Sequence, residues 1–254
     1  MNINELKEKW LNEEKIAKIN GWDFSYIKDR HLEKPLSFSY YDTIKKYLKD
    51  DYKLLDIDTG GGEFLMTLNH PTKNISCTEG YDPNILLCIK KLLPLGINFK
   101  EAKDYSNLPF CDNSFDIIIN RHGSYNVNEI KRLLKPNGLF ITQQVGDDND
   151  LDLINLLLPN QEKSYPNHNE KYQSKLFIDA GFEKILGLEE FGQIDFYDVG
   201  AIVWFSKIIE WEFIDFSVEK CFNQLLKCEK IISKTGKVST RTHRFLLVMQ
   251  CKKN

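Results

Sequence analysis

Apolar runs and amphipathic segments alternate along the middle of the chain, from residue 53 to residue 146. Short apolar runs bounded by turn residues predict strands, and apolar positions three or four residues apart predict helices. We expect strands in KLLDID, NISCTE, INFKEA, SFDIIIN and GLFITQQV, and helices in FLMTLNH, NILLCIKKLL and EIKRLL, the last starting at Asn128. Short connections between such elements predict βαβ units in a parallel sheet that is covered on both faces.

The flanking segments predict further helices and two more strands, which makes seven strands in all. Residues 1–20 have the apolar spacing of an amphipathic helix, and Gly21 is placed to end it. An aromatic-rich stretch then leads into a short helix from about Asp42 to Leu48. The remaining chain predicts a loop with a short helix at 147–167, a helix at 170–181, a strand at 183–191, helices at about 196–209 and 218–232, and a last strand at 243–251.

The amino-acid composition and the net charge argue against several classes of protein. The chain of 254 residues is 42% hydrophobic and has a formal net charge of −3, so it lacks the basic excess of proteins that grip nucleic-acid phosphates. Its six cysteines contain no C-x-x-C pair, which argues against a zinc site and favours reduced thiols. The polar N-terminus has no apolar signal region, and no apolar run reaches the ~18–20 residues of a membrane span. We therefore expect a cytoplasmic protein with no metal and no membrane partner, and nucleic acid is a less favoured partner than a small molecule.

A glycine-rich turn follows the first of the parallel strands, in the segment from Asp56 to Glu63. Glycines let the backbone approach a ligand closely, and a strand–turn–helix unit of this kind is suited to a polar ligand. Glu79 follows 19 residues after Gly60, at the end of the next strand, where a carboxylate can accept both hydroxyl hydrogens of a ribose. The nicotinamide fingerprint G-x-G-x-x-G fails at its third position, which is Leu65, so a dinucleotide site is the weaker alternative.

This segment resembles motif I of the class I S-adenosylmethionine-dependent methyltransferases of the type 11 kind, whose general form is acidic-x-Gly-x-Gly-x-Gly. Asp56, Gly60 and Gly62 match the motif. Downstream segments also match in order: Glu79 resembles the ribose-binding acid, DYSNLPF resembles the adenine-binding segment, and SFDIIINRH and RLLKPNGLF resemble the fourth strand and the turn before the fifth. The resemblance covers residues 53–146 strongly and the last strand weakly.

The resemblance implies a Rossmann-like, seven-stranded α/β sheet with helices on both faces, and S-adenosyl-L-methionine as the cofactor. It predicts one domain over residues 1–254, made of an N-terminal helical cap (1–50), a donor-binding core (51–146), the C-terminal half of the core (147–194), a helical insertion (195–240) and the last strand (241–254). The residues expected to bind the cofactor are Asp56, Asp58, Gly60, Gly61, Gly62, Glu79, Gly80, Tyr81, Asp104, Tyr105, Asn120 and Arg121.

One departure from the family concerns Asp58, which stands where the motif has its first glycine. Asp is among the residues that best tolerate a left-handed backbone conformation. A carboxylate at this place can lie close to the ammonium or sulfonium of the donor and alter its affinity. The alternative is an Asp side chain that faces solvent or accepts hydrogen bonds from turn amides.

The methyl acceptor is the least determined part of the function. His122, at the end of the fourth strand, is the candidate general base, and the candidate acceptor-binding residues are Trp22, Tyr26, Tyr40, Tyr41, Arg121, His122 and Trp204. The alternative for the aromatic residues is ordinary core packing. The chain lacks the Asn/Asp-Pro-Pro-Tyr/Phe motif of many amino-directed methyltransferases, which favours a small-molecule acceptor. An RNA or protein methyltransferase and a donor-binding protein without catalysis stay open as alternatives.

Overall fold

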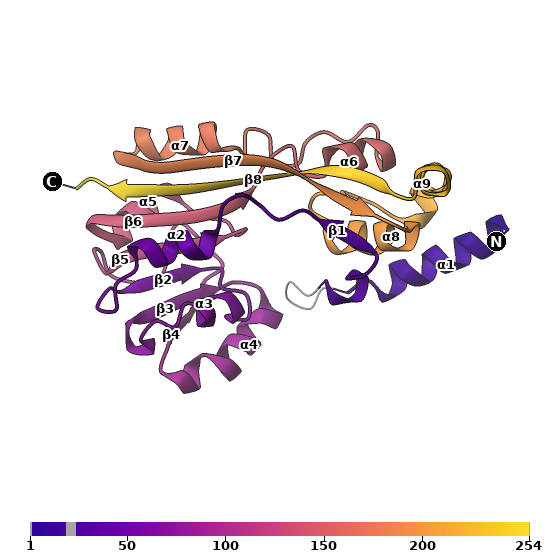
Figure 1. Ribbon diagram of the computed structural model, residues 1–254. Coiled ribbons are helices and arrows are strands. Elements are labelled where there is room, and N and C mark those ends of the chain that lie inside the picture. Colours follow the sequence, from indigo (N-terminus) through magenta and orange to yellow (C-terminus); the bar gives the residue numbers. More distant parts are fainter. Residues whose placement is uncertain (1, 19–23, 254) are drawn as a thin grey trace. The chain divides into compact units, whose positions relative to one another are not determined.

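The computed structural model describes residues 2–18 and 24–253 (Figure 1), which divide into two compact units. The first unit consists of Met1–Leu36, Asp147–Pro166 and Glu190–His243, and the second of Ser37–Gly146, Asn167–Glu189 and Arg244–Asn254. The N-terminal segment and the insertion before the last strand both fall in the first unit, whereas the glycine turn falls in the second. That the whole chain forms one domain stays a prediction.

A parallel sheet forms the centre of the second unit, as the alternating pattern predicts. Its five parallel strands take the order β6-β5-β2-β3-β4, and β8 lies antiparallel to β6. Their bounds are β2 (Leu54–Ile57), β3 (Ile75–Glu79), β4 (Asn98–Glu101), β5 (Phe115–Arg121), β6 (Leu134–Val145) and β8 (Val238–Cys251). Because β2, β3, β4 and β5 are parallel neighbours, the loops after them meet at one edge of the sheet.

Both faces of this sheet are buried, which explains why its strands are continuous apolar runs rather than alternating ones. Leu54 and Leu55, successive residues of β2, belong to two different apolar clusters, one on each face. On the face of Leu54 pack α2 (Tyr40–Tyr47), α3 (Glu63–Thr67) and α4 (Asp82–Lys91), and on the face of Leu55 pack α5 (Val127–Leu133) and α7 (Glu170–Asp179). Three short 3₁₀ segments, among them Thr72–Asn74 and Leu93–Leu95 in this unit, complete the described helical turns.

Helices make up most of the first unit and enclose an apolar core of their own. They are α1 (Ile3–Ile16), α6 (Leu151–Leu157), α8 (Val199–Ile208) and α9 (Val218–Thr235), with a 3₁₀ turn at Ser25–Ile27. Arg30 joins this unit through polar contacts, because its guanidinium pairs with Glu13 at 2.9 Å and with Asp198 at 2.6 Å. The first helix is shorter than the predicted 1–20, because it ends at Ile16 with Ala17 as its C-cap. Gly21, the predicted end, lies outside the described residues.

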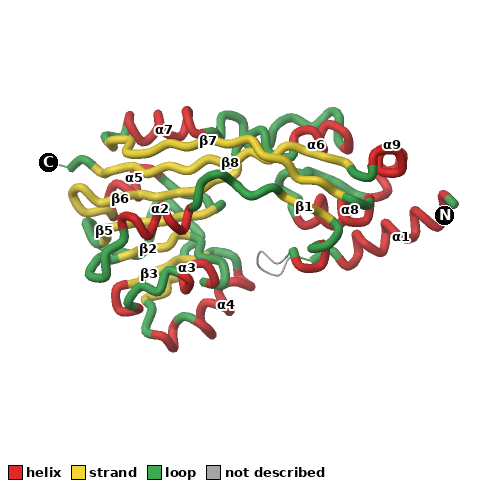
Figure 2. Tube along the Cα trace, viewed as in Figure 1, coloured by secondary structure: helices red, strands yellow, loops and turns green. Residues whose placement is uncertain are grey.

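The predicted number of seven strands is wrong, because the described residues contain eight. The additional strand is β1 (His31–Glu33), which pairs antiparallel with Ile194–Phe196 of β7 (Phe182–Phe196). Its three residues are too short for a periodic pattern. They become a strand only because β7 continues beyond Phe191, where the sequence pattern predicted its end. Figure 2 shows β7 and β8 as two long strands, and both exceed their predicted lengths.

Two helices begin at residues other than those predicted. The helix expected to begin at Asn128 begins at Val127, because Asn126 is its N-cap and accepts hydrogen bonds from the amides of Asn128 and Glu129. The helix expected from about Phe196 begins at Val199, after the N-cap Asp198. Within residues 2–18 and 24–253, no helix combines the length and the apolar character that a bilayer crossing requires.

The start of α3 yields a test of the glycine turn. Gly62 is the N-cap of α3 with φ of 80°, and a methyl group added to it would approach the buried Leu92 side chain to 2.7 Å. Gly96 has nearly the same φ of 79°, with open space beside it. We predict that Gly96→Ala costs about 1 kcal/mol of unfolding free energy for the backbone alone. Gly62→Ala costs roughly 1–3 kcal/mol more for the overpacking. Equal losses in urea unfolding would contradict the turn geometry.

Candidate functional site

The glycine turn begins directly after β2 and reverses the chain into α3. Three of its residues have positive φ: Asp58 at 58°, Gly60 at 64° and Gly62 at 80°. Asp58 thus adopts the left-handed conformation that a glycine would adopt at this place in the motif. A methyl group on Gly60 would meet no atom of the described residues within 4 Å beyond its chain neighbours. The turn therefore borders open space on the side of Gly60.

Glu79, the last residue of β3, reaches back to this turn. Its Oε2 accepts a hydrogen bond from the Gly60 amide at 2.8 Å, and its Oε1 accepts from the amides of Gly80 and Tyr81 at 2.8 and 2.9 Å. The side chain is buried although it carries a carboxylate. These backbone donors hold the carboxylate beside the turn. The structure thus brings together the acid and the glycines that the sequence predicts as neighbours.

Asp56 lies inside β2, two residues before the turn. Its carboxylate is buried and accepts a hydrogen bond from the Thr59 hydroxyl at 2.6 Å. Burial raises the pKa of Asp56 to about 7, against the lowering effect of the Thr59 hydroxyl, and the negative charges of Asp58 and Glu79 raise it further. Asp56 is therefore close to half protonated at neutral pH.

Asp58 has a partner from another loop. The Tyr105 hydroxyl donates a hydrogen bond to its Oδ2 at 2.6 Å, while its Oδ1 is buried and has no hydrogen-bond partner of good geometry within the described residues. Burial raises the pKa of Asp58 to about 6, the Tyr105 hydroxyl lowers it, the charge of Glu79 raises it, and the nearby Ser124 amide lowers it. Tyr105, one of the residues expected to bind the cofactor, is thus in direct contact with Asp58.

The three carboxylates at the turn share one electrostatic feature. In the part of the chain that the structure describes, no lysine, arginine or histidine side chain forms an ion pair with Asp56, Asp58 or Glu79. Burial is the largest cause of the raised pKa values of Asp56 and Asp58, and the negative charges of the neighbouring carboxylates raise them further. A ligand that carries positive charge would relieve this repulsion.

Asn120 and the loop after β5 form the other wall of the turn. Asn120 is fully buried; its Nδ2 donates to the Ile57 carbonyl at 3.0 Å and its Oδ1 accepts from Gln144 at 2.6 Å. It therefore clamps β2 against β5 and β6. A methyl group on Gly123 would come within 2.7 Å of the Asp58 side chain, so the glycine leaves room for that side chain. Neither Gly123 nor Gln144 is part of the predicted site.

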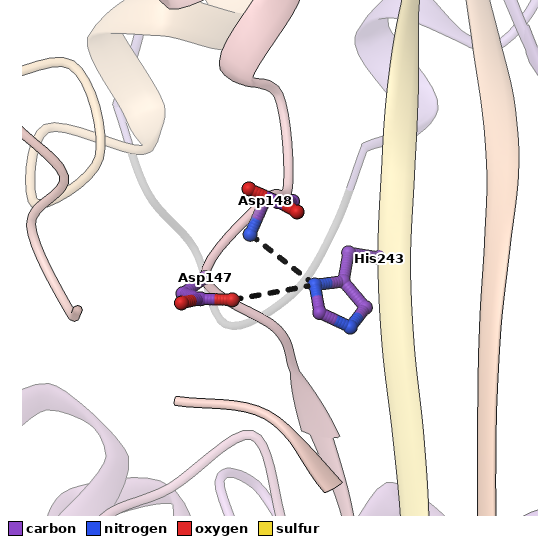
Figure 3. A group of neighbouring side chains, drawn as sticks. All are labelled: Asp147, Asp148 and His243. Atoms are coloured by element: carbon purple, nitrogen blue, oxygen red, sulfur yellow. Dashed lines mark hydrogen bonds and ion pairs between the residues drawn. The ribbon is translucent and has the colours of Figure 1, made fainter. Parts of the chain in front are cut away.

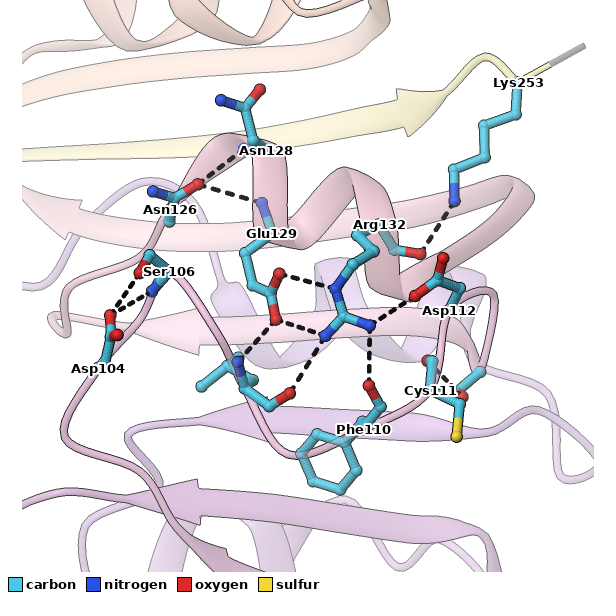
Figure 4. A network of polar contacts seen from close by, with 12 residues as sticks. Asp104, Ser106, Phe110, Cys111, Asp112, Asn126, Asn128, Glu129, Arg132 and Lys253 are labelled. Atoms are coloured by element: carbon cyan, nitrogen blue, oxygen red, sulfur yellow. Dashed lines mark hydrogen bonds and ion pairs between the residues drawn. The ribbon is translucent and has the colours of Figure 1, made fainter.

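The predicted adenine-binding segment after β4 is held by a polar network (Figure 4). Asp104 is exposed and accepts hydrogen bonds from the amide and hydroxyl of Ser106, as in an Asx turn. Further along, the buried Glu129 accepts from the Leu108 amide at 2.7 Å and from the Arg132 guanidinium at 2.6 Å. The Arg132 guanidinium also donates to the carbonyls of Leu108 and Phe110. Two side chains of α5 thereby fix the backbone of this segment.

The remaining predicted cofactor-binding residues line the surroundings of the turn. Gly61 lies under the flexible Glu63 side chain, and Gly80 allows the end of β3 to approach the Ala102 carbonyl. Tyr81 is half exposed and is the N-cap residue of α4. The Arg121 side chain lies over the ring of Phe64, 5.4 Å from its centroid.

Two predicted acceptor-binding tyrosines lie on α2. Tyr40 is buried, stacks on Phe64 at 5.1 Å between ring centroids, and donates its hydroxyl to the Asn120 carbonyl at 3.0 Å. Tyr41 is partly exposed. Tyr40 therefore supports the strand end that carries Asn120, through its hydroxyl and its ring.

His122, the candidate base, directly follows β5 with φ of 59°. Burial lowers its pKa well below the usual range of histidine, and the positive charges of Arg244 and Arg121 lower it further. The imidazole is therefore neutral at pH 7. Its Nε2 lies 3.4 Å from Gln143 Nε2.

The other predicted acceptor-binding aromatics belong to the first unit. Trp204 is buried in the apolar core of that unit, and Tyr26 packs against it with ring centroids 5.6 Å apart. The Tyr26 hydroxyl donates to Glu13 at 3.0 Å. Trp22 lies outside the described residues.

A second cluster of ligand-type side chains lies in the first unit (Figure 3). Ligand atoms of Asp147, Asp148 and His243 are all within 4.8 Å of one another. The Asp148 amide donates to Nδ1 of His243 at 3.2 Å, and the Lys163 ammonium pairs with the Asp148 carboxylate at 2.5 Å and lies 3.6 Å from that of Asp147. In contrast to the glycine turn, this cluster has a positive partner from the chain itself.

The sequence profile of the methyltransferase domain family matches residues 55–142. This stretch runs from β2 to β6 and contains the glycine turn, Glu79 and the segment held by Arg132. Residues 55–142 thus match a methyltransferase domain.

The proteins that match this chain differ in sequence identity and in the share of each chain that is covered. Phthiotriol/phenolphthiotriol dimycocerosates methyltransferase of Mycobacterium tuberculosis is 27% identical over 169 residues, which are 58% of this chain and 60% of the relative. The chain thus spans about three fifths of the length of the curated relatives it matches. Among solved structures, a SAM-dependent methyltransferase from Methanosarcina mazei has a TM-score of 0.52 at 19% identity, covering 84% of this chain and 98% of its own.

The methyltransferase fold also carries other activities. The [4+2]-cyclase SpnF has a TM-score of 0.50 at 15% identity, with 84% of this chain and 81% of the cyclase covered. At such identities a structural likeness shows the fold alone. The reaction has to be argued from the site.

The network that holds the predicted adenine-binding segment can be tested by unfolding. Glu129→Gln leaves the Arg132 guanidinium without its buried charged partner, and we predict a loss of about 2 kcal/mol. Asp112→Asn removes an exposed partner of the same guanidinium at 2.6 Å, for which we predict a loss of under ~1 kcal/mol. Urea denaturation of both variants measures the difference. Equal losses would mean that Glu129 does not anchor the segment.

The raised pKa values of Asp56 and Asp58 predict an unusual pH dependence. Their folded pKa values, about 7 and 6, lie above the ordinary value of 3.8, so the native state binds more protons than the unfolded state between about pH 4 and 7. Stability from these two groups therefore falls as the pH rises through this window. His122, whose pKa is lowered, acts in the opposite direction, so a difference between variants is needed.

Asp56→Asn removes the buried charge and keeps an acceptor for the Thr59 hydroxyl. We predict that it raises the melting temperature at pH 8 relative to wild type, by an amount equivalent to about 1 kcal/mol or more, roughly 2–4 °C, and that the gain is smaller at pH 5. Asp104→Asn, at an exposed carboxyl with a lowered pKa, serves as the control and shows no such change between the two pH values. Scanning calorimetry at both pH values measures the melting temperatures of the two variants and the wild type. A gain that is the same at both would contradict the assignment.

Proposed function

We propose that this protein is an enzyme that transfers a methyl group from S-adenosylmethionine to a small-molecule acceptor. The observation that carries the proposal is the set of three carboxylates without a cationic partner beside the open face of Gly60. A sulfonium nucleoside supplies positive charge and ribose hydroxyls, the two features that these groups lack. The family of the domain supports the same donor.

Individual residues can be assigned to parts of the donor. Glu79 would accept the ribose hydroxyls, because an ionised carboxylate can accept about four hydrogen bonds and Oε2 has one short bond, from Gly60. Asp56 and Asp58 would face the cationic methionine end. The segment fixed by Glu129 and Arg132 would lie against the adenine.

The donor brings a methyl group that is already activated, so the chain's own residues need only orient the acceptor, exclude water and, for some acceptors, accept a proton. His122 is the proposed proton acceptor, because burial keeps its imidazole in the neutral form that can take a proton. The acidic net charge supports a small molecule rather than RNA. The name of the mycobacterial relative supports including lipid-like hydroxyl compounds among the acceptors to be tested.

A second candidate is a protein that binds the donor without transferring its methyl group. The hydrogen bond between Tyr105 and Asp58 favours this candidate, because it joins two loops at the edge where the donor would bind. Formation of S-adenosylhomocysteine over a panel of metabolites and lipid-like alcohols separates the two. Turnover with any acceptor supports the enzyme, whereas donor binding without turnover over the whole panel supports the binding protein.

Glu79 provides the test of the donor site. We predict that Glu79→Gln weakens S-adenosylmethionine binding by about tenfold or more, because an amide replaces one ribose acceptor with a donor, at ~1.4 kcal/mol per tenfold. Glu101→Gln is the matched control, since Glu101 pairs in register with Glu79 on β4 but is exposed. Isothermal titration calorimetry gives both affinities, and the melting temperature checks folding. Unchanged binding in a folded Glu79→Gln variant would contradict the assignment of the ribose site.

A further inference from the structure

Asp58 is the only residue of the turn that differs from the family motif in a way that adds a charge. It follows β2, while its partner Tyr105 follows β4, and β3 lies between these strands. The hydrogen bond from Tyr105 therefore reaches across the end of β3, where Glu79 lies. Gly123, after β5, leaves space for the Asp58 side chain on the opposite side.

The Asp58 carboxylate is only partly satisfied by these neighbours. Oδ2 has the Tyr105 hydroxyl, and the buried Oδ1 lacks a partner of good geometry within the described residues. A buried acceptor without a partner costs free energy, so its persistence calls for an explanation such as a missing ligand. The titratable groups around it are Asp56, Glu79 and Tyr105, and none of them supplies positive charge.

We infer that Asp58 is a specificity-determining residue that favours the methylated donor over its demethylated product by charge. This inference rests on the proposed function. The donor carries a sulfonium, and the product carries an uncharged thioether at the same position. Both share the adenosine, the ammonium and the carboxylate, so a carboxylate discriminates between them only if it lies close to the sulfur.

Asp58 fits this role better than the other two acids. The short hydrogen bond of the Asp56 carboxylate goes to Thr59 within the same turn, and Asp56 lies inside a buried strand. Glu79 already accepts three backbone amides, which fix it on the side of β3. The Asp58 side chain lies against Gly123, after β5, and its buried Oδ1 lacks a partner of good geometry within the described residues. It thereby favours product release, because the product loses the attraction that held the donor.

Tyr105 acts as a positioning residue for Asp58. Its hydroxyl donates to one carboxylate oxygen and holds the side chain in place, but it carries no charge that could distinguish donor from product. The preference for the donor should therefore depend on the charge of Asp58 and survive the loss of the Tyr105 hydroxyl.

The test compares donor and product affinities by isothermal titration calorimetry for the full chain. Asp58→Asn keeps the size of the side chain, an acceptor for Tyr105 and tolerance of positive φ, so it is expected to fold. We expect S-adenosylmethionine to bind about tenfold more weakly to this variant and S-adenosylhomocysteine to change by less than about twofold. Glu101→Gln, which removes an exposed acid at the end of β4, should leave both affinities unchanged.

Each other outcome overturns the inference. Equal weakening of donor and product places Asp58 near a group that both share, and unchanged affinities place it away from the ligand. Tyr105→Phe is expected to keep the donor preference, and if it abolishes that preference as Asp58→Asn does, the hydroxyl rather than the charge is responsible. Should the wild-type protein bind neither compound, the proposed function itself fails, which is distinct from a failure of the Asp58 assignment alone.

Discussion

Repulsion between like charges at short range is the interaction on which the account of this site depends. Asp56, Asp58 and Glu79 are brought to one edge of a sheet, where Asp56 and Glu79 are buried and Asp58 is partly buried. The chain offers them hydroxyls and backbone amides but no cation among the described residues. Such an arrangement disfavours ionisation of the free protein and favours any ligand that brings positive charge. A cationic ligand at this edge would recover free energy that the folded, ligand-free state loses.

The fold produces this arrangement through strand order and one turn. Parallel neighbours β2 and β3 end at the same edge, so Asp56 and Glu79 approach each other although 23 residues separate them in sequence. Positive φ values at Asp58 and Gly60 turn the chain back under Glu79. Asn120 then clamps β2 to β5 from the other side. In the first unit the comparable acids Asp147 and Asp148 have Lys163 beside them, so negative charge without a partner is a property of the turn and not of the protein in general.

The sequence predicted the parts of this structure that depend on local pattern. Buried strands such as β5 are continuous apolar runs, and the spacing of Gly60 and Glu79 follows from the parallel sheet. The strands and the proximity of Gly60 and Glu79 could therefore be predicted from the sequence. β1 could not be predicted, because three residues are too few to show a periodic pattern of apolar positions and the strand pairs with β7, which is distant in sequence. The contact between Asp58 and Tyr105 joins residues 47 apart, and no local rule places them together. Likewise Trp204, which the sequence offers as a binding residue, packs in an apolar core that only the assembled helices of the first unit create.

Proton release on donor binding tests the central claim most directly. Calorimetric titration of S-adenosylmethionine at pH 6.5, repeated in buffers with different ionisation enthalpies, measures how many protons leave the protein. A cation placed among the three acids lowers their pKa values, so the account predicts binding with net release of protons from Asp56 and Asp58. Binding without proton release, or no binding at all, would contradict it.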